Sequence, residues 1–225
     1  MENKNGQGIF YGVIGVATLV VAIIGATFAF FSAQAQTNYV NNIAGNTLNL
    51  AGALSLTVSK VDLGGSAASA SLVPATISTT DAAGINQALT AKCEKGGYTG
   101  CHVYKIVAQS SETVNAASIN LATLTTTATV KSDWKYVIYT GSDTAATALV
   151  TGGTGSMNLA SAFDMHKGAG LTANTPVTYY LMVYLSDDGA AQNDGGENDA
   201  TGTYTGTVTM TAGTGSVSAN FTTTG

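Results

Sequence analysis

Two cysteines are the residues of this chain whose type and spacing most clearly indicate chemistry. Cys93 and Cys101 are the only cysteines among 225 residues, and Gly96 and Gly97 lie in the centre of the stretch between them. Two central glycines in a short stretch are typical of a hairpin turn, whose ends a disulfide can join. In an oxidising compartment we expect this bond to form, with a stabilisation of roughly 2–3 kcal/mol from loop entropy.

A metal site is the alternative, with Cys93, Cys101 and His102 as ligands. Structural zinc takes four ligands, usually in pairs with C-x-x-C spacing, and this chain offers neither. The other histidine is His166, and no H-E-x-x-H or G-x-S-x-G motif accompanies either histidine. We therefore expect a structural disulfide, no metal, no cofactor and no enzyme activity. A Ser-His-Asp catalytic site stays an alternative, because a residue count does not show which side chains are neighbours in the folded chain.

The one dense run of charge is acidic. It holds Asp187, Asp188, Asp194, Glu197 and Asp199. Clustered carboxylates are candidate Ca²⁺ ligands, but these do not follow the D-x-[DN]-x-[DN]-G spacing. A solvated hairpin loop is the simpler interpretation.

Six tyrosines on predicted strands are candidates for a carbohydrate-binding face: Tyr136, Tyr139, Tyr179, Tyr180, Tyr184 and Tyr204. The alternative is that their rings pack over neighbouring strands, which is the commoner role of strand tyrosines. Nucleic acid is excluded as a partner on charge. The chain has 8 basic residues, all lysines, against 13 acidic residues, and no basic cluster.

The elements that position these residues are mostly strands. Apolar and polar residues alternate in Leu54–Val58 and in Thr203–Thr211, which is the period of a strand with one buried face. In Val177–Leu185 the second face is only half polar, so we expect both faces to be covered. Further strands are predicted at 101–109, 119–131 and 134–139, and turns at Gly64–Gly65, Gly96–Gly97, 141–143, Gly152–Gly153 and Gly195–Gly196. This pattern predicts an antiparallel β-sandwich.

Short helices are expected only as excursions between strands. One spans Asp81–Ala91 with Asp81 as its cap, and the other spans Ser161–Lys167, ended by Gly168.

The amino-terminal segment Ile9–Phe31 contains no charged residue and is long enough to cross a bilayer. A cleaved signal peptide is the preferred interpretation, because small residues follow the apolar stretch. A retained membrane anchor is one alternative. A type IV prepilin cut after Gly8 is another, although that class usually has a glutamate where this chain has Val13.

Several stretches resemble one known family. Ala26–Ser32 (ATFAFFS) is similar to the signal-peptidase site of the camelysin and TasA-type matrix proteins of Gram-positive bacteria, and Asn42–Leu50 is similar to their opening strand, with one insertion and Asn49 in place of Asp. The stretch from Cys93 to Ile106 resembles a cysteine hairpin of related secreted Firmicutes proteins, although the best-known members lack it. The stretch from Gln192 to Val208 resembles their closing strand.

This resemblance implies cleavage between Ala29 and Phe30 and a jelly-roll-like β-sandwich. It also implies that subunits polymerise by donating the mature amino-terminal segment to a neighbouring copy. The expected organisation is a signal peptide or anchor helix (1–29), a donor-strand or linker segment (30–47) and one sandwich domain (48–225). The expected assembly residues are apolar: Phe30, Phe31, Ala33, Ala35, Tyr39 and Ile43.

The absence of charge from Phe30 to Ser59 is compatible with such pairing, because soluble monomers normally protect uncharged strand edges. We therefore expect a secreted fibre subunit of the cell surface or biofilm matrix, with copies of itself as partners. A membrane contact is expected only through the segment before processing. A membrane-anchored adhesin or carbohydrate-binding module and a secreted hydrolase are the alternatives.

Overall fold

The computed structural model describes residues 16, 18, 48–50, 54–65, 72–128, 132–157, 159, 161–187, 189, 202–213 and 215–223. The chain forms two units, Met1–Asn41 and Asn42–Gly225. In the first unit Val16 and Thr18 are helical, and the rest of the apolar segment 9–31 lies outside the described residues. No helix in the described part of the chain is both long enough and apolar enough to span a membrane.

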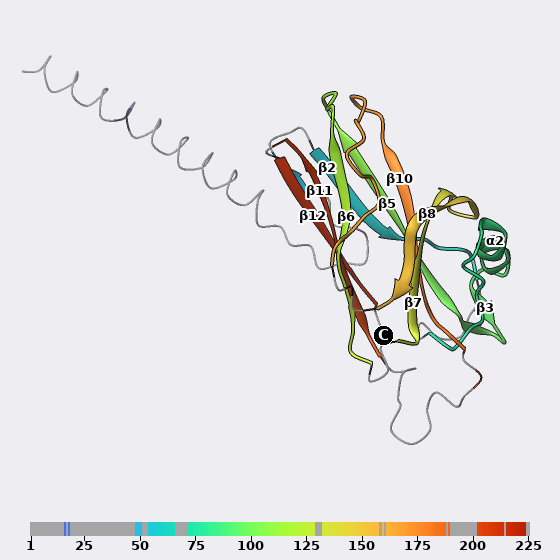
Figure 1. Ribbon diagram of the computed structural model, residues 1–225. Coiled ribbons are helices and arrows are strands. Elements are labelled where there is room, and N and C mark those ends of the chain that lie inside the picture. Colours follow the sequence, from blue (N-terminus) through green and yellow to red (C-terminus); the bar gives the residue numbers. More distant parts are fainter. Residues whose placement is uncertain are drawn as a thin grey trace, which may run out of the picture. The chain divides into compact units, whose positions relative to one another are not determined.

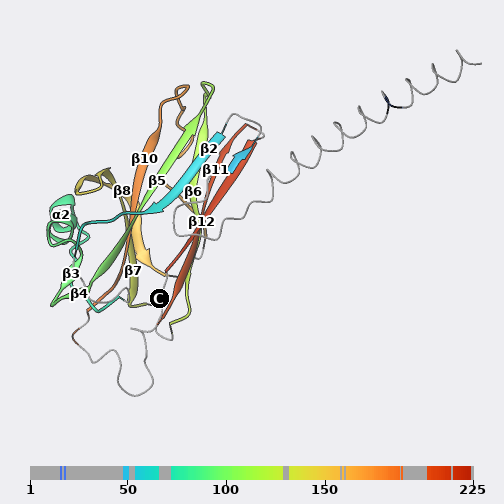
Figure 2. The same ribbon diagram turned by 180° about the vertical axis from the view of Figure 1, so that it is seen from behind.

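The second unit contains two antiparallel sheets, as the alternation predicts (Figures 1 and 2). The larger sheet has the strand order β1 (Leu48–Leu50), β2 (Leu54–Lys60), β5 (Cys101–Ser110), β10 (Val177–Leu185), β7 (Trp134–Ser142) and β8 (Ala145–Ser156). The smaller sheet has the order β12 (Gly215–Thr222), β11 (Tyr204–Ala212), β6 (Ala117–Thr126) and β9 (Phe163–Asp164). A small hairpin joins β3 (Glu94–Lys95) and β4 (Tyr98–Thr99).

The main core lies between the two sheets. Leu56 and Leu181 of the larger sheet and Ile119 and Val208 of the smaller sheet are completely buried in it. Each belongs to a strand in which every second side chain faces inward, so the alternation read from the sequence directly builds this core. The predicted all-β sandwich is confirmed for the described residues.

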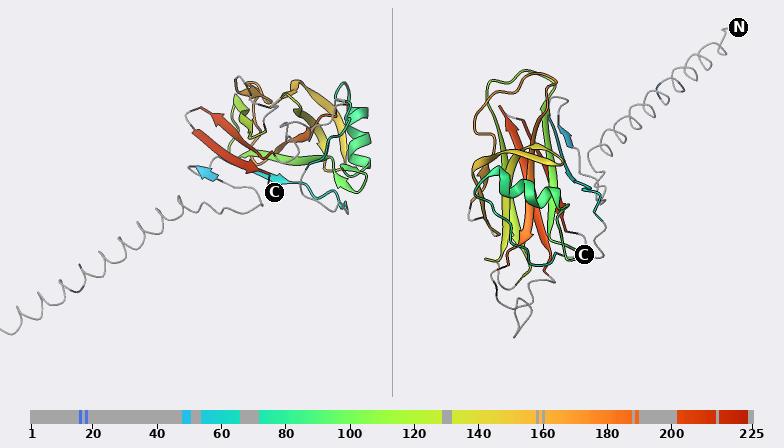
Figure 3. Two further views of the ribbon diagram at one scale, coloured as in Figure 1. Left: turned by 90° about the horizontal axis from the view of Figure 1, so that it is seen from below. Right: turned by 90° about the vertical axis from the view of Figure 1, so that its right-hand side faces the viewer.

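A second, smaller core lies on the outer face of the six-stranded sheet. The helix α2 (Ala82–Thr90) crosses this face, as the right panel of Figure 3 shows. Its N-cap is Asp81, whose carboxylate accepts a hydrogen bond of 2.9 Å from the Gly84 N–H, as predicted. Ile85 and Leu89 of α2 are buried against a set of sheet residues: Val103, Val137, Tyr139, Tyr180, Met182 and Tyr184.

Two local predictions are wrong. Ser161–Lys167 does not form a helix; Phe163–Asp164 is strand β9, which pairs with β6. The phenyl ring of Phe163 packs against the main core, and this long-range contact outweighs the weak helical preference of a short segment. Gly152–Gly153 is not a turn but lies within β8, where the pairing with β7 shifts register and Gly152 has a φ of +75°.

Candidate functional site

The predicted disulfide between Cys93 and Cys101 is present, and it closes the β3–β4 hairpin. Gly96 and Gly97 form the turn with φ values of +60° and +83°, a conformation that glycine adopts without strain. Both sulfur atoms are bonded to each other, so neither is a metal ligand. Among the described residues, no group of three or more His, Cys, Asp or Glu side chains is placed to hold a metal ion.

His102 is buried between the two sheets and takes part in a hydrogen-bonded network. Its Nδ1 lies 2.7 Å from the hydroxyl of Tyr204, which in turn lies 2.8 Å from the hydroxyl of Tyr104. The Tyr104 hydroxyl also donates to the carbonyl of Thr222 at 3.3 Å. Burial raises the pKa of Tyr104 to about 12 and raises that of Tyr204 well above its ordinary value. The network links β5 to β11 and β12 across the main core, which is a structural role.

His166 lies near a serine and an aspartate, but the hydrogen bonds do not form a nucleophile pair. The hydroxyl of Ser118 donates to Asp164, and the backbone N–H of His166 also donates to Asp164 at 3.1 Å. The His166 ring contacts the Tyr179 hydroxyl at 2.9 Å and the Ala169 carbonyl at 3.2 Å. Nucleophilic catalysis needs a serine bonded to the histidine, and this cluster of described residues has no such bond.

The six tyrosines do not form a carbohydrate-binding face. Each is less than 9% exposed, so no ring presents a face to a ligand. The preferred interpretation, that these rings pack over neighbouring strands, is confirmed, because α2 and the opposing sheet cover both sides of these strands. Tyr139 and Tyr180 stack on each other with 5.2 Å between ring centroids, as strand tyrosines commonly do.

One carboxylate lies at the margin of this tyrosine pair. Tyr180 donates to Asp143 at 2.8 Å, and Lys105 lies 3.0 Å from the same oxygen. The Tyr180 hydroxyl, followed by Lys105, lowers the pKa of Asp143. The three residues join β5, β10 and the turn after β7 at the surface.

Of the candidate calcium ligands, Asp187 is described. Its carboxylate pairs with Lys95 at 2.7 Å and accepts from the Gly189 N–H at 3.1 Å, and these contacts lower its pKa. Asp188, Asp194, Glu197 and Asp199 lie outside the described residues, as do the predicted cleavage site Ala29–Phe30 and all the predicted assembly residues from Phe30 to Ile43.

The candidate site that remains is the β1 edge of the six-stranded sheet. β1 pairs with β2 only from Leu54 to Leu56. The N–H of Val61 donates to the carbonyl of Val103 of β5 and continues the β2–β5 ladder. Because backbone groups alternate in direction along a strand, the N–H and C=O of odd-numbered β2 residues face β5. The backbone groups of the even-numbered Val58 and Lys60 therefore point away from β5, at positions beyond the end of β1. No described residue bonds these outward groups, which are of the kind that an added strand can pair with.

This edge is uncharged before Lys60 and regular in register. Val58 is 1% exposed because its side chain enters the main core, while its backbone lies at the sheet edge. β2 also contacts β12 of the opposing sheet, so an added strand would lie along the side of the sandwich where both sheets end (Figure 2). The uncharged stretch from Phe30 to Ser59 is the sequence signal for this site. The position of the edge follows only from the strand order of the folded sheet.

Comparison with known proteins adds little. Neither the models of protein families nor the curated proteins include a match to this chain. A solved structure of a family 123 glycoside hydrolase from Clostridium perfringens is similar, with a TM-score of 0.30 and 10% sequence identity. The similarity covers 75% of this chain and 27% of that one, so this chain spans about a quarter of its length. At this TM-score the similarity supports no statement about the fold or function of this chain.

Proposed function

We propose that this protein is a secreted structural subunit of an extracellular fibre, and that copies assemble when the segment 30–47 of one adds a strand to another. The observation that supports the proposal is the edge of β2, where no described residue bonds the outward backbone groups of Val58 and Lys60. Main-chain hydrogen bonds at such an edge give affinity to an extended segment of almost any sequence, and side-chain packing then selects the register.

The chemistry of the segment supports the same proposal. Beyond residue 36 the pattern is mixed, since Tyr39 and Ile43 share a register with the polar Thr37 and Asn41, and Val40 falls opposite. The alternation is clear from Phe31 to Gln36, where Phe31, Ala33 and Ala35 alternate with Ser32, Gln34 and Gln36. This is the period of a strand with one face buried and one face solvated. The lack of charge means that burying the segment against a core costs no ion desolvation. The resemblance to camelysin and TasA-type proteins, and the jelly-roll-like topology that it implies, belong to this proposal.

The test compares two proline variants. Lys60→Pro removes an N–H that points away from β5, so it blocks strand addition at β2 without breaking the β2–β5 ladder. The matched control is Ser218→Pro in β12. The Thr223 N–H bonds Tyr204 of β11, and by alternation the N–H of Ser218 points away from β11 in the same way.

We expect protein that begins at Phe30, and the same protein with Ser218→Pro, to form fibres visible by negative-stain microscopy. Lys60→Pro and a deletion of residues 30–42 should remain monomeric in sedimentation at high concentration. If the protein that begins at Phe30 is monomeric, or if deleting residues 30–42 leaves fibres unchanged, the proposal is wrong. Fibres that persist in Lys60→Pro and disappear in Ser218→Pro would move the acceptor edge from β2 to β12.

A further inference from the structure

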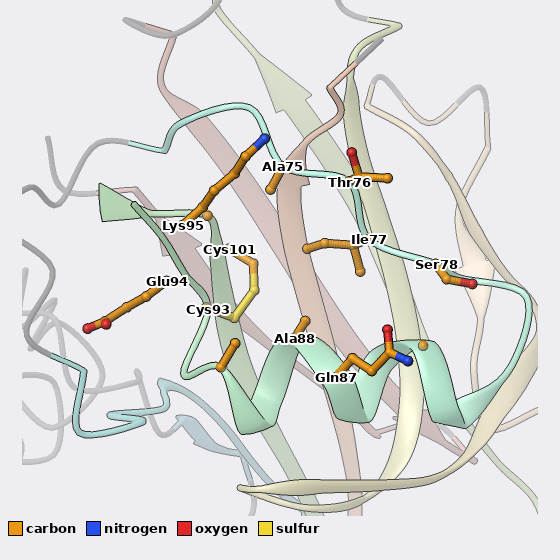
Figure 4. A pocket seen from close by; sticks show the side chains of 13 residues that line it. Ala75, Thr76, Ile77, Ser78, Gln87, Ala88, Cys93, Glu94, Lys95 and Cys101 are labelled. Carbon is orange, nitrogen blue, oxygen red and sulfur yellow. A yellow bond between two sulfur atoms is a disulfide. The ribbon is translucent and has the colours of Figure 1, made fainter. Parts of the chain in front are cut away.

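A groove on the outer face of the six-stranded sheet has no role in the function proposed above. It lies between the extended segment Ala75–Ser78 and α2, with the disulfide at one end (Figure 4). Its volume is about 260 Å³. The side chains of Ile77 and Ala88 and the Cys93–Cys101 bond lie between the two walls and form an apolar part of a lining that also contains polar residues (Figure 4).

The strand wall of the groove carries backbone groups that no described residue bonds. Ala75 donates to Leu185 at 2.9 Å and accepts from Asp187 at 3.3 Å, so both of its backbone groups face the end of β10. In an extended chain the groups of the next residue, Thr76, face the opposite way. Thr76 is exposed, and no described residue bonds its N–H or C=O. On the helix wall the exposed Gln87 presents an amide that can donate and accept.

These features define the ligand chemistry. A volume of about 260 Å³ is smaller than the roughly 300–1,000 Å³ of typical small-molecule sites, and it suits one large apolar side chain. The lysine at the rim, Lys95, is already paired with Asp187, so the groove is not built to receive an anion. An extended backbone beside apolar side chains is the arrangement that binds an extended peptide through one anchoring side chain.

The direction of strand addition at β2 indicates which peptide reaches this region. β1 runs antiparallel to β2, so a donated strand in the same direction carries its amino-terminal end past Lys60, toward Val61–Gly65. That stretch approaches the end of α2, because Lys92 donates to the carbonyl of Gly64 at 3.1 Å. Residues 30–43, fully extended, span roughly 45 Å, which is ample reach for the aromatic end of the segment.

We propose that this groove receives an aromatic side chain, Phe30 or Phe31, of the segment donated by another copy, and so anchors the far end of the donated strand. The inference rests on the proposed function, because it requires donation along β2. The groove supplies Ile77, Ala88 and the disulfide to contact the ring, the backbone groups of Thr76 to pair with the donated backbone, and Gln87 at the rim. It gives the aromatic end of the segment a specific receptor distinct from the β2 edge.

The test is site-specific cross-linking between chains that begin at Phe30. Ser32→Cys, which keeps both aromatic rings, is placed in one chain and mixed with Ala88→Cys in a second, tagged chain under mild oxidation. The control partner is Thr209→Cys, which lies on the outer face of the smaller sheet. The two native cysteines are joined to each other, and a mixture of Ala88→Cys with the parent chain controls for exchange with that bond. We expect covalent dimers with Ala88→Cys and none with Thr209→Cys. Absence of the first product, or equal amounts of both, overturns the inference.

A second measurement separates this inference from the proposed function. Phe31→Ser should raise the concentration needed for fibre formation roughly 10- to 100-fold, the loss expected for one buried aromatic side chain. The matched change Gln34→Ser, on the polar side of the same segment, should leave it unchanged. Fibres that depend on Lys60 but show neither the cross-link nor the Phe31→Ser effect would refute the groove and leave strand donation standing. If no variant or parent forms fibres, both proposals fail together.

Discussion

The central strands of the two sheets share an antiparallel environment but differ in how many faces they bury. β10 lies between β5 and β7, and β11 lies between β6 and β12. On β10, Leu181 faces the main core and Met182 faces the second core, and both are completely buried. On β11, Val208 is completely buried, whereas the neighbouring Thr207 is partly exposed and bonds Asn220 at 2.9 Å.

The difference follows from what covers each sheet. The outer face of the six-stranded sheet carries α2, whereas the outer positions of β11 are four threonines: Thr205, Thr207, Thr209 and Thr211. A strand with two apolar faces needs a layer on each side, and a strand with one apolar face can leave the other in water. The six-stranded sheet carries both the β2 edge and the groove, while the smaller sheet closes the main core.

The largest expected effect tests whether both faces of β10 contribute to stability. Leu181→Ala and Met182→Ala should each lower the free energy of unfolding by roughly 2–5 kcal/mol, because each removes a fully buried side chain. On β11 we expect a large loss for Val208→Ala and a change within about 0.5 kcal/mol for Thr207→Ala. Urea unfolding measures all four. A small effect at Met182 would show that the cover by α2 contributes little.

The disulfide is the next strongest element of the outer layer. Replacing both Cys93 and Cys101 by Ser should cost roughly 2–3 kcal/mol, because the bond restricts a short loop in the unfolded chain. Since Cys93 and Cys101 belong to the second core, the loss should be accompanied by faster hydrogen exchange in α2. Exchange in β11 should rise only with the global loss of stability. Uniform acceleration in both regions would show that the two layers unfold as one unit.

Much of this contrast between the two sheets was readable from the sequence. The apolar residues on both faces of Val177–Leu185 predicted a covered strand, and Asp81 predicted the start of the covering helix, because both signals are local. The spacing of the two cysteines predicted the Cys93–Cys101 disulfide for the same reason. β8 was not predicted, since its Ala-, Thr- and Gly-rich sequence shows no clear alternation. β9 was misread because two residues of strand are specified by their partner β6.

The candidate site was less predictable than the fold. The uncharged stretch from Phe30 to Ser59 indicated a pairing segment, but the position of the edge depends on which strands are neighbours, and local sequence does not encode strand order. The groove was missed altogether. It brings together Ala75–Ser78, α2 and the disulfide, whose joint geometry follows from tertiary packing, and Thr76 carries no side-chain signal for its backbone bonding.

A smaller effect concerns the tyrosines that join the two sheets. The folded-state pKa of Tyr104 is raised from 10.0 to about 12 by burial. Its contribution to stability is therefore fully present below pH 10 and is lost as the pH rises toward 12, by roughly 1–3 kcal/mol. Tyr104→Phe should reduce the slope of unfolding free energy against pH in this window. Phe221→Leu, beside the Tyr104 ring, should lower stability and keep the slope. Equal slopes for Tyr104→Phe and the parent would contradict the assignment.

The smallest expected effect lies at the polar margin of the second core. Asp143→Asn should destabilise by less than about 1 kcal/mol, because the carboxylate is about half exposed and its ion pair with Lys105 is screened by water. The folded-state pKa of Asp143 lies below its ordinary value of 3.8, so its contribution is present above that value and is lost as the pH falls through the lower one. The parent and Asp143→Asn should therefore differ in urea unfolding at pH 7 and converge in acid. A difference that persists in acid would mean that the asparagine disturbs Tyr180 by packing, and the outer face of this sheet would then depend on shape rather than on charge.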